Sequence, residues 1–417
     1  MDDYGKILII AMPAFLVLVL LEKLYGYFKG EDTVPLDDAV SSLSSGMSNV
    51  LKDVLGLSVG IVSYEWLYGH LSLFTIGNTF IVYAIAFVVI DFYGYWSHRF
   101  AHKINLFWNH HVIHHSSEEF NLACALRQPV SGIVKFFTFL LIPAAIMGVP
   151  SEVIAIVLPL HLFLQFWYHT RHLGKLGFIE YILVTPSHHR VHHAINPEYL
   201  DKNLSQIFIF WDFLFGTFQE ELDEVPPVYG ISRPAATRNP FKINFQHLFI
   251  LIKDTWYSKH FLDKLTIWFR PTGWRPEGFD AAYPIKKIED VYNFPKYKPV
   301  LSQKQLVWSI LHLFVVMFFL LDLFARIGSL DFLNILTYGL YIFVTIYSLT
   351  DLMDKNKWNF IIELLRGFVS IFIFFWLGDW FGQSMVIYAV FLYQFVSFGI
   401  AFTFFLDQRD RDASMAY

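Results

Sequence analysis

Histidines are concentrated in one part of this chain, at spacings that suit metal binding. Thirteen of the seventeen lie between His98 and His193, where even spacing along 417 residues would place about four. A neutral imidazole is the commonest metal ligand in proteins, and ionisable side chains are costly in an apolar, membrane-bound chain unless they serve a function. The pattern therefore predicts a polyhistidine metal centre.

The clustered histidines fall into three boxes and one separate residue. Box one is His98-x-x-x-His102, box two is His111-x-x-His114-His115, and box three is His189-x-x-His192-His193. The two rings of box one, four residues apart, share one face of a helix. In boxes two and three, the histidines at i and i+3 share a face and the third ring reaches around to an adjacent one, so each triplet can hold one metal and touch a second. His169, after an aromatic run, is a ninth candidate ligand. Nine imidazoles exceed the six positions of one octahedral ion, which predicts two metals about 3.5 to 4 Å apart.

The ligand type limits the set of possible metals but does not identify one. Imidazole-rich sites suit zinc, copper, iron or nickel. A zinc hydrolase would usually carry a His-Glu-x-x-His helix, and the sequence has none. A site at a membrane face instead favours a redox metal acting on an apolar substrate that arrives from the lipid.

Asp91 lies seven residues before His98, on the same face if the segment is helical. Its carboxylate has two interpretations. It orients an imidazole as a hydrogen-bond acceptor behind the ligands, or it pairs with Arg99 or Lys103 at a helix end.

Other polar residues near the boxes are also candidates. Glu118, Asn121 and Arg127 either gate the site or bind a substrate head group or a reductant, or they cap the helix after box two; the capping interpretation is favoured. Arg190, inside box three, either neutralises a phosphate or pairs with Asp212. His110, His161, His172 and His188 are weaker candidates that suit a hydrogen-bonding role behind the ligands.

The elements that position these residues are predicted to be membrane helices. The chain is 55% hydrophobic and only 16% charged, and roughly 20 apolar residues cross a bilayer. Suitable runs occur at 7–28, 47–67, 71–90, 132–149, 152–168, 306–325, 331–350, 358–378 and 383–405. The pair between 132 and 168 is short and proline-containing, and is expected to be tilted or re-entrant. The predicted fold class is an all-α integral membrane protein, a multi-span helical bundle.

Basic residues predict the orientation. Of 31 Lys and Arg residues, 20 lie in 98–131, 169–205 and 219–305, which the positive-inside rule places in the cytoplasm together with the histidine boxes. Three spans before box one would put the N-terminus outside. One apolar hairpin separates His115 from His189, so the chain returns to the same face and the boxes can meet.

The predicted organisation has four parts. Residues 1–90 form N-terminal membrane helices, 91–218 the histidine-rich catalytic region, 219–305 a proline-rich cytoplasmic cap, and 306–417 C-terminal membrane helices. The first apolar run lacks a small-residue cleavage site and is read as an uncleaved anchor. The net charge of −5 provides no basic surface for nucleic acid, and the single cysteine, Cys124, is expected to be a small buried side chain.

The three boxes, in this order and around an apolar hairpin, resemble the signature of the fatty acid hydroxylase and sterol desaturase superfamily of membrane non-haem di-iron oxygenases. Within it, the chain is similar to the alkylglycerol monooxygenase branch. The motifs that carry this likeness include Gln165-Phe-Trp-Tyr-His169, Thr185-Pro-Ser-His188, Asp201-Lys-Asn203, Trp211-Asp-Phe-Leu-Phe-Gly-Thr217 and Arg270-Pro-Thr-Gly-Trp-Arg-Pro276.

The resemblance implies two iron ions held by the nine box and lone histidines, O2, a membrane lipid substrate and an electron donor. The implied reaction is hydroxylation of an unactivated carbon; next to an ether oxygen, the product would collapse to a fatty aldehyde and a glycerol compound. The donor is left open between tetrahydrobiopterin and another reductant, because Lys103 stands where the branch has an acidic residue.

Two groups of alternatives accompany this hypothesis. Within the superfamily, the substrate could be a fatty acyl, sterol or carotenoid chain, and the outcome desaturation. Outside it, a histidine-rich metal transporter or sensor would distribute ligands at several depths of the spans, and a structural protein would tolerate loss of the histidines. Clustering of the histidines at one face favours the oxygenase.

Overall fold

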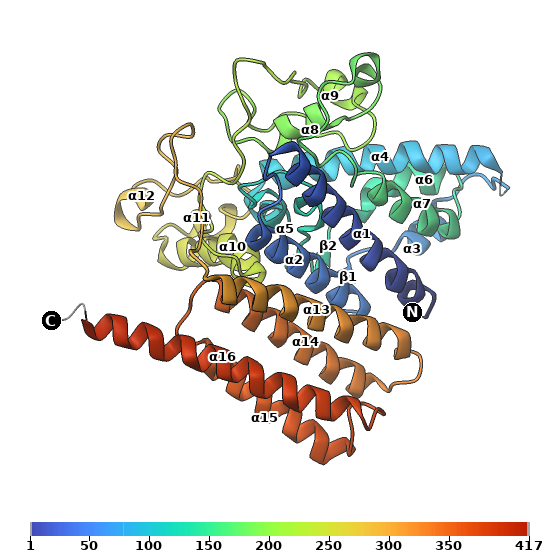
Figure 1. The fold of residues 1–417 in the computed structure, drawn as a ribbon. Coiled ribbons are helices and arrows are strands. Elements are labelled where there is room, and N and C mark those ends of the chain that lie inside the picture. Colours follow the sequence, from blue (N-terminus) through green and yellow to red (C-terminus); the bar gives the residue numbers. More distant parts are fainter. Residues whose placement is uncertain (1, 78, 415–417) are drawn as a thin grey trace.

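The computed structural model describes residues 2–77 and 79–414, and nearly all of its regular structure is helical (Figure 1). The α-helices are α1 Asp2–Lys29, α2 Leu36–Val54, α3 Tyr64–Leu71, α4 Phe80–Lys103, α5 Asn105–His115, α6 Ile142–Ile146, α7 Ser151–Phe163, α8 Pro186–His193, α9 Phe210–Phe215, α10 Pro240–Tyr257, α11 Phe261–Thr266, α12 Phe279–Ala282, α13 Gln303–Arg326, α14 Phe332–Met353, α15 Asn359–Leu377 and α16 Val386–Ser414. Short 3-10 helices are η1 Cys124–Leu126, η2 Phe137–Leu141 and η3 Gly177–Tyr181, and strands β1 Val59–Gly60 and β2 Val134–Lys135 pair in parallel.

Six of the described helices are long and apolar enough to cross a membrane. They are Ile7–Lys29, Phe80–Lys103, Gln303–Arg326, Phe332–Met353, Asn359–Leu377 and Val386–Arg409. The prediction of an all-α integral membrane protein is confirmed. In Figure 1, α13–α16 form the lower layers, and the helices that carry the histidine boxes, α4, α5 and α8, lie above them.

In the described residues, one long apolar helix, α1, precedes α4, which carries box one at its end, and the expected span at 47–67 is wrong. α2 ends at Val54, and a turn at Gly56, whose φ is +67°, leads into β1 before α3 begins. The positive φ is a conformation that favours glycine and cannot continue a helix. The parity argument for an outside N-terminus, which needed three spans, therefore fails. The expected run at 71–90 is also displaced, since α4 begins at Phe80.

The segment between 132 and 168 contains short apolar helices. α7 has 13 residues, about 20 Å of helix, against a hydrocarbon core of about 30 Å. A turn at Gly148 to Pro150 separates it from α6. Neither helix can span a bilayer alone, in keeping with the expected tilted or re-entrant arrangement.

Local sequence signals set several helix ends. Ser302 and Gln305 form a reciprocal capping box at the start of α13, and Asn239 caps α10 just before Pro240. These side chains satisfy amide groups that the first turn leaves unbonded. α15 ends at Gly378, whose φ of +80° is left-handed.

Two apolar cores flank the histidine segments. One joins α1, α2 and α13–α16 around side chains such as Leu320 and Ile346, and the other joins α4, α6 and α7 around Val82 and Val149. α2 lies close to the segment after box two, because a Cβ on Gly46 would come within 2.7 Å of the Leu126 carbonyl oxygen. α2, which belongs to the first core, thus packs beside the segment that follows box two.

Candidate metal centre

Three helices and one connecting segment carry the predicted ligands. Box one lies at the end of α4, box two on α5 and box three on α8, while His169 follows α7. Ile104 between α4 and α5 is extended (φ −124°, ψ 125°), so the chain turns and α5 packs back on α4. The Asn105 side chain fixes this turn by donating to the carbonyl of Ile267, 3.0 Å away.

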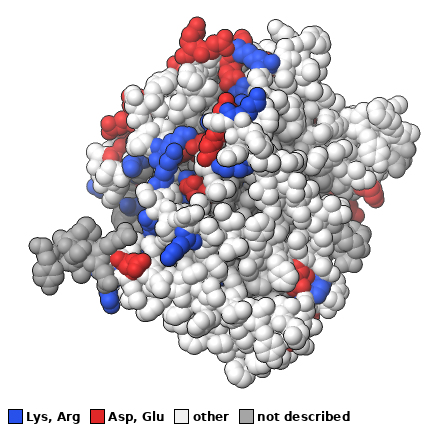
Figure 2. All heavy atoms as spheres, viewed as in Figure 1, with Lys and Arg blue, Asp and Glu red and all other residues white. Residues whose placement is uncertain are grey.

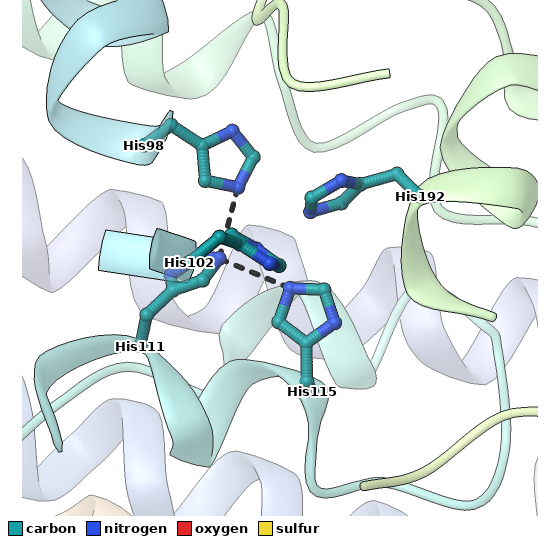
Figure 3. A group of neighbouring side chains, drawn as sticks. All are labelled: His98, His102, His111, His115 and His192. Carbon is teal, nitrogen blue, oxygen red and sulfur yellow. Dashed lines mark hydrogen bonds between the residues drawn. The ribbon is translucent and has the colours of Figure 1, made fainter. Parts of the chain in front are cut away.

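The structure brings all nine predicted histidines together in two adjacent groups. The five-histidine group is His98, His102, His111, His115 and His192, and the four-histidine group is His114, His169, His189 and His193. Within each group the candidate ligand atoms all lie within 4.8 Å of one another. Figure 3 shows the imidazoles of the five-histidine group converging from α4, α5 and α8.

The spacing of the ring nitrogens suits a shared ion in each group. In the five-histidine group, Nε2 of His111 lies 2.9 Å from that of His98 and 3.0 Å from that of His115 (Figure 3). In the other group, Nε2 of His189 lies 2.8 Å from that of His169 and 3.0 Å from that of His193. Nitrogens about 2.1 Å from one ion and at right angles to each other would be about 3.0 Å apart.

Unpartnered nitrogens in the same place support this fit. Nε2 of His102 and Nε2 of His192 are buried and have no hydrogen-bond partner in the described part of the chain. A buried polar atom without a partner costs free energy. A metal ion would satisfy both atoms, so the residues present fit the metals that the sequence predicts.

Hydrogen bonds behind the rings orient several ligands. Nδ1 of His98 donates to the carbonyl of Leu204 (2.8 Å), Nδ1 of His169 to that of Gln165 (3.0 Å), and Nδ1 of His192 to that of Lys202 (3.0 Å). A proton fixed on Nδ1 leaves the Nε2 lone pair available for a metal. Sequence patterns could not identify these acceptors, because they are backbone atoms.

One short loop supplies three of the acceptors. Asp201 and Asn203 have φ of +57° and +50°, a conformation that Asp and Asn adopt more readily than most residues. The loop presents the Lys202 and Leu204 carbonyls to the rings, and the Asp201 carboxylate accepts from Nδ1 of His102 at 3.3 Å. The Asp201-Lys-Asn203 motif is part of the family likeness in the sequence, but the sequence does not predict this role for Asp201.

Burial keeps the imidazoles outside the membrane helices neutral. Desolvation, followed by the charges of neighbouring histidines, holds the pKa values of His111, His115 and His193 well below the usual range. The pKa of His114 is lowered to about 3 by burial first and then by His98. Neutral imidazoles are the form that binds metals.

Asp91 plays neither of the two predicted roles. Its carboxylate accepts from Nε2 of His161 (2.8 Å), from the backbone amides of Ile207 and Phe208, and from Nε1 of Trp211. It therefore orients an imidazole outside the two groups and makes no pair with Arg99 or Lys103. Its four donors join α4, α7 and the segment that leads into α9.

The other polar candidates make internal contacts. Glu118 accepts from the backbone amide of Tyr297, and Asn121 donates to the Thr33 carbonyl at 2.8 Å. Arg127 donates to Asp38 and Ser116, and its carbonyl accepts from Nδ1 of His114 at 3.3 Å. Arg127 thus contacts the site through its backbone.

Arg190 does not pair with Asp212. Its guanidinium binds Glu221 through Nε and a terminal nitrogen, at 2.7 and 2.6 Å, and donates to the carbonyls of Thr170 and Leu173. Asp212 instead accepts from the backbone amides of Leu204 and Ser205. The sequence did not predict the pairing of Arg190 with Glu221, because the two residues are 31 positions apart and meet only where the chain turns back after α9.

The four weaker histidines lie outside both groups. His188 takes part in the capping box of α8 with Thr185, and His172 is bonded to Thr33 at 3.0 Å. His161 is held by Asp91, and His110 packs against Phe136. The interpretation that favoured the nine stronger candidates agrees with this geometry.

Apolar helices long enough to cross a membrane, together with two adjacent groups of converging imidazoles, are typical of membrane-bound polyhistidine metalloenzymes. Residues 83–217, which contain all three boxes, match the fatty acid hydroxylase family. The histidine cluster and this family are consistent with iron.

Curated relatives make the assignment narrower. The chain is 34% identical to alkylglycerol monooxygenase of Homo sapiens over 87% of its own length and 81% of that protein. Identity to the alkylglycerol monooxygenases of Xenopus tropicalis and Danio rerio is 31% and 33%, over 86% and 85% of this chain and 80% and 79% of those proteins. No solved structure matches. The chain belongs to the alkylglycerol monooxygenase family and is an oxygenase of the membrane.

Proposed function

We propose that this protein is a di-iron monooxygenase that hydroxylates the alkyl chain of ether lipids of the alkylglycerol class. The observation that carries the proposal is the division of nine imidazoles into groups of five and four, each with its ring nitrogens close enough to share one ion. Family membership supports the substrate class, since the relatives are named for alkylglycerols.

The proposed ligands of the two ions are the nine histidines. Bound there, two irons would supply the activation of O2 that hydroxylation of an unactivated carbon requires. The chain's own residues hold the rings in place: Asp201, Leu204 and Lys202 fix His102, His98 and His192 from behind. Burial of the groups excludes bulk water from the reacting centre.

The overall reaction balances with an external two-electron donor. One oxygen atom of O2 enters a C–H bond on the carbon next to the ether oxygen, and the other leaves as water with two electrons and two protons. The resulting hemiacetal breaks its C–O bond to give a fatty aldehyde and a free glycerol hydroxyl. We propose a reduced pterin or a redox protein as the donor.

We further propose that the site faces the cytoplasm. The basic residues that support this orientation lie in the histidine region and in residues 219–305. In Figure 2 the charged side chains gather over the upper part of this view, and the lower part, occupied by α13–α16, is largely uncharged.

The test uses detergent-purified protein supplied with alkylglycerol, O2 and reduced tetrahydrobiopterin. The expected result is fatty aldehyde formation with matching oxygen uptake and about two irons per chain. The same protein is tested with a fatty acid and a sterol as the superfamily alternatives. If the fatty acid or the sterol is oxidised and alkylglycerol gives no aldehyde, the proposed substrate class is wrong. If the purified protein contains no iron, the proposal of a di-iron oxygenase is wrong.

A further inference from the structure

A partly open cavity lies beside the five-histidine group, on the other side of Trp108. Its volume is about 100 Å³, several times the ~15 Å³ that a single water needs. Trp108 lines the cavity, and its ring centroid lies 5.2 Å from that of His102 and 5.6 Å from that of His115. One aromatic side chain thus separates the cavity from the candidate metal centre.

The far wall of the cavity is attached to the helices that carry the ligands. Thr272 and Gly273 line it, and the amide of Thr272 donates to the carbonyl of Lys103 at the end of box one. Gly273 donates to the Asn105 side chain at the start of α5. A group held in the cavity would therefore be fixed relative to the metal ligands.

The cavity is lined by a cation, Arg233, that forms no ion pair among the described residues. Arg233 donates to the carbonyl of Gly273 at 2.9 Å. The nearby carboxylates of Asp254 and Asp280 are bound by Arg275 at 2.6 and 2.8 Å. Burial, followed by the charge of Arg275, lowers the pKa of Arg233, and the more distant charges of Asp280 and Asp254 offset only part of this effect.

Further hydrogen-bonding groups line the same cavity. The Thr272 hydroxyl is buried without a partner in the described part of the chain, which costs free energy unless a ligand or water meets it. Gln246 and His247 of α10 also line the cavity. Nε2 of His247 donates a hydrogen bond to the Asn105 carbonyl, 3.0 Å away.

We propose that this cavity binds an anionic oxyacid group, such as a phosphate ester, next to the five-histidine group. A guanidinium binds phosphate through parallel hydrogen bonds, and Thr272, which lines the same cavity, carries a hydroxyl without a partner in the described residues. The anion belongs either to the head group of an ether lipid or to a small soluble molecule. The proposal extends the proposed function by a head-group class.

The test measures equilibrium binding of radiolabelled ligands to detergent-purified full-length protein without O2, so that it does not depend on turnover. The ligands are 1-O-alkylglycerol 3-phosphate, neutral 1-O-alkylglycerol, sn-glycerol 3-phosphate and inorganic phosphate. Arg233→Gln should weaken binding of a phosphate ligand about tenfold or more. Arg270→Gln, an exposed arginine outside the cavity lining, is the matched control and should change binding less than about twofold.

Each outcome has a defined meaning. Arg233-dependent binding of the phospholipid alone supports the proposal and assigns the anion to a lipid head group, whereas Arg233-dependent binding of the soluble phosphates supports it with a soluble ligand. No phosphate binding, or equal losses in Arg233→Gln and Arg270→Gln, overturns the proposal. If Arg233→Gln does not fold, Thr272→Val decides by the same comparison. Failure of the phosphate-binding proposal would not contradict the proposed function, because aldehyde formation from neutral alkylglycerol is measured in a separate experiment.

Discussion

The Asp201 carboxylate accepts a hydrogen bond from Nδ1 of His102, and the Lys103 ammonium lies 2.6 Å from its second oxygen. The loop after box three thus reaches back to box one and orients a ring whose Nε2 is buried without a partner in the described residues. A side chain far away in sequence therefore helps to arrange the candidate metal centre.

Asp201→Asn should weaken metal binding. An outer hydrogen-bond acceptor fixes the ring and raises its basicity, and losing one typically costs about 10 to 100-fold in metal affinity. Iron retained during titration with a chelator, measured by plasma mass spectrometry, would report the loss. Glu220→Gln, which changes an exposed carboxylate paired with Lys175, should retain iron as wild type does; equal retention by Asp201→Asn would argue against an orienting role.

The same carboxylate should contribute to stability in a pH-dependent way. Burial alone would raise its pKa, but the His102 hydrogen bond and Lys103 outweigh burial and lower the pKa from 3.8 to about 2. A lowered pKa gives stability that is present above the unfolded value and lost as the pH falls through about 4 to 2. In metal-free protein, the difference in unfolding temperature between wild type and Asp201→Asn should shrink over that range. A constant difference down to pH 2 would contradict this.

His102→Ala should remove most of the bound iron, whereas His110→Ala should not. His102 belongs to the five-histidine group, and His110, next to His111 on α5, belongs to neither group. Loss of one ligand from a two-metal site is not replaced locally, so iron per chain should fall by more than about half. The measurement is iron per chain for both variants. Full iron in His102→Ala would remove this residue from the proposed ligands.

Asp38→Asn should destabilise the fold around box two. The fully buried Asp38 carboxylate binds Arg127 at 2.7 Å and Arg238 at 2.8 Å, and breaking a buried pair by removing one partner costs about 3–5 kcal/mol. Thermal unfolding in detergent would measure the effect. Asp37→Asn is the control, because Asp37 pairs with Arg238 at a more exposed position. An effect no larger than that of the control would reject a central role for Asp38.

The sequence was sufficient for the ligand candidates and the class of fold. Box spacing of three and four residues follows helical geometry, so the histidines of each box could be chosen as candidates from the sequence. The expected pairing of positions i and i+3 was wrong, because the structure groups His111 with His115 and His189 with His193, which are four residues apart. Long apolar runs similarly predicted the C-terminal helices. The membrane span predicted at 47–67 was wrong, because the average hydrophobicity of the segment does not reveal the turn at Gly56.

Only the tertiary structure decided how the nine histidines divide and what lies behind them. His114 groups with His169, His189 and His193 and not with its box-two neighbours. Successive side chains point in different directions around the axis of α5, so adjacent histidines face different partners. The roles of Asp91, Arg190 and Asp201 depended on contacts that join residues 31 to 120 positions apart. Spacing along a helix determines which side chains share a face, whereas the packing of separate segments determines what that face meets.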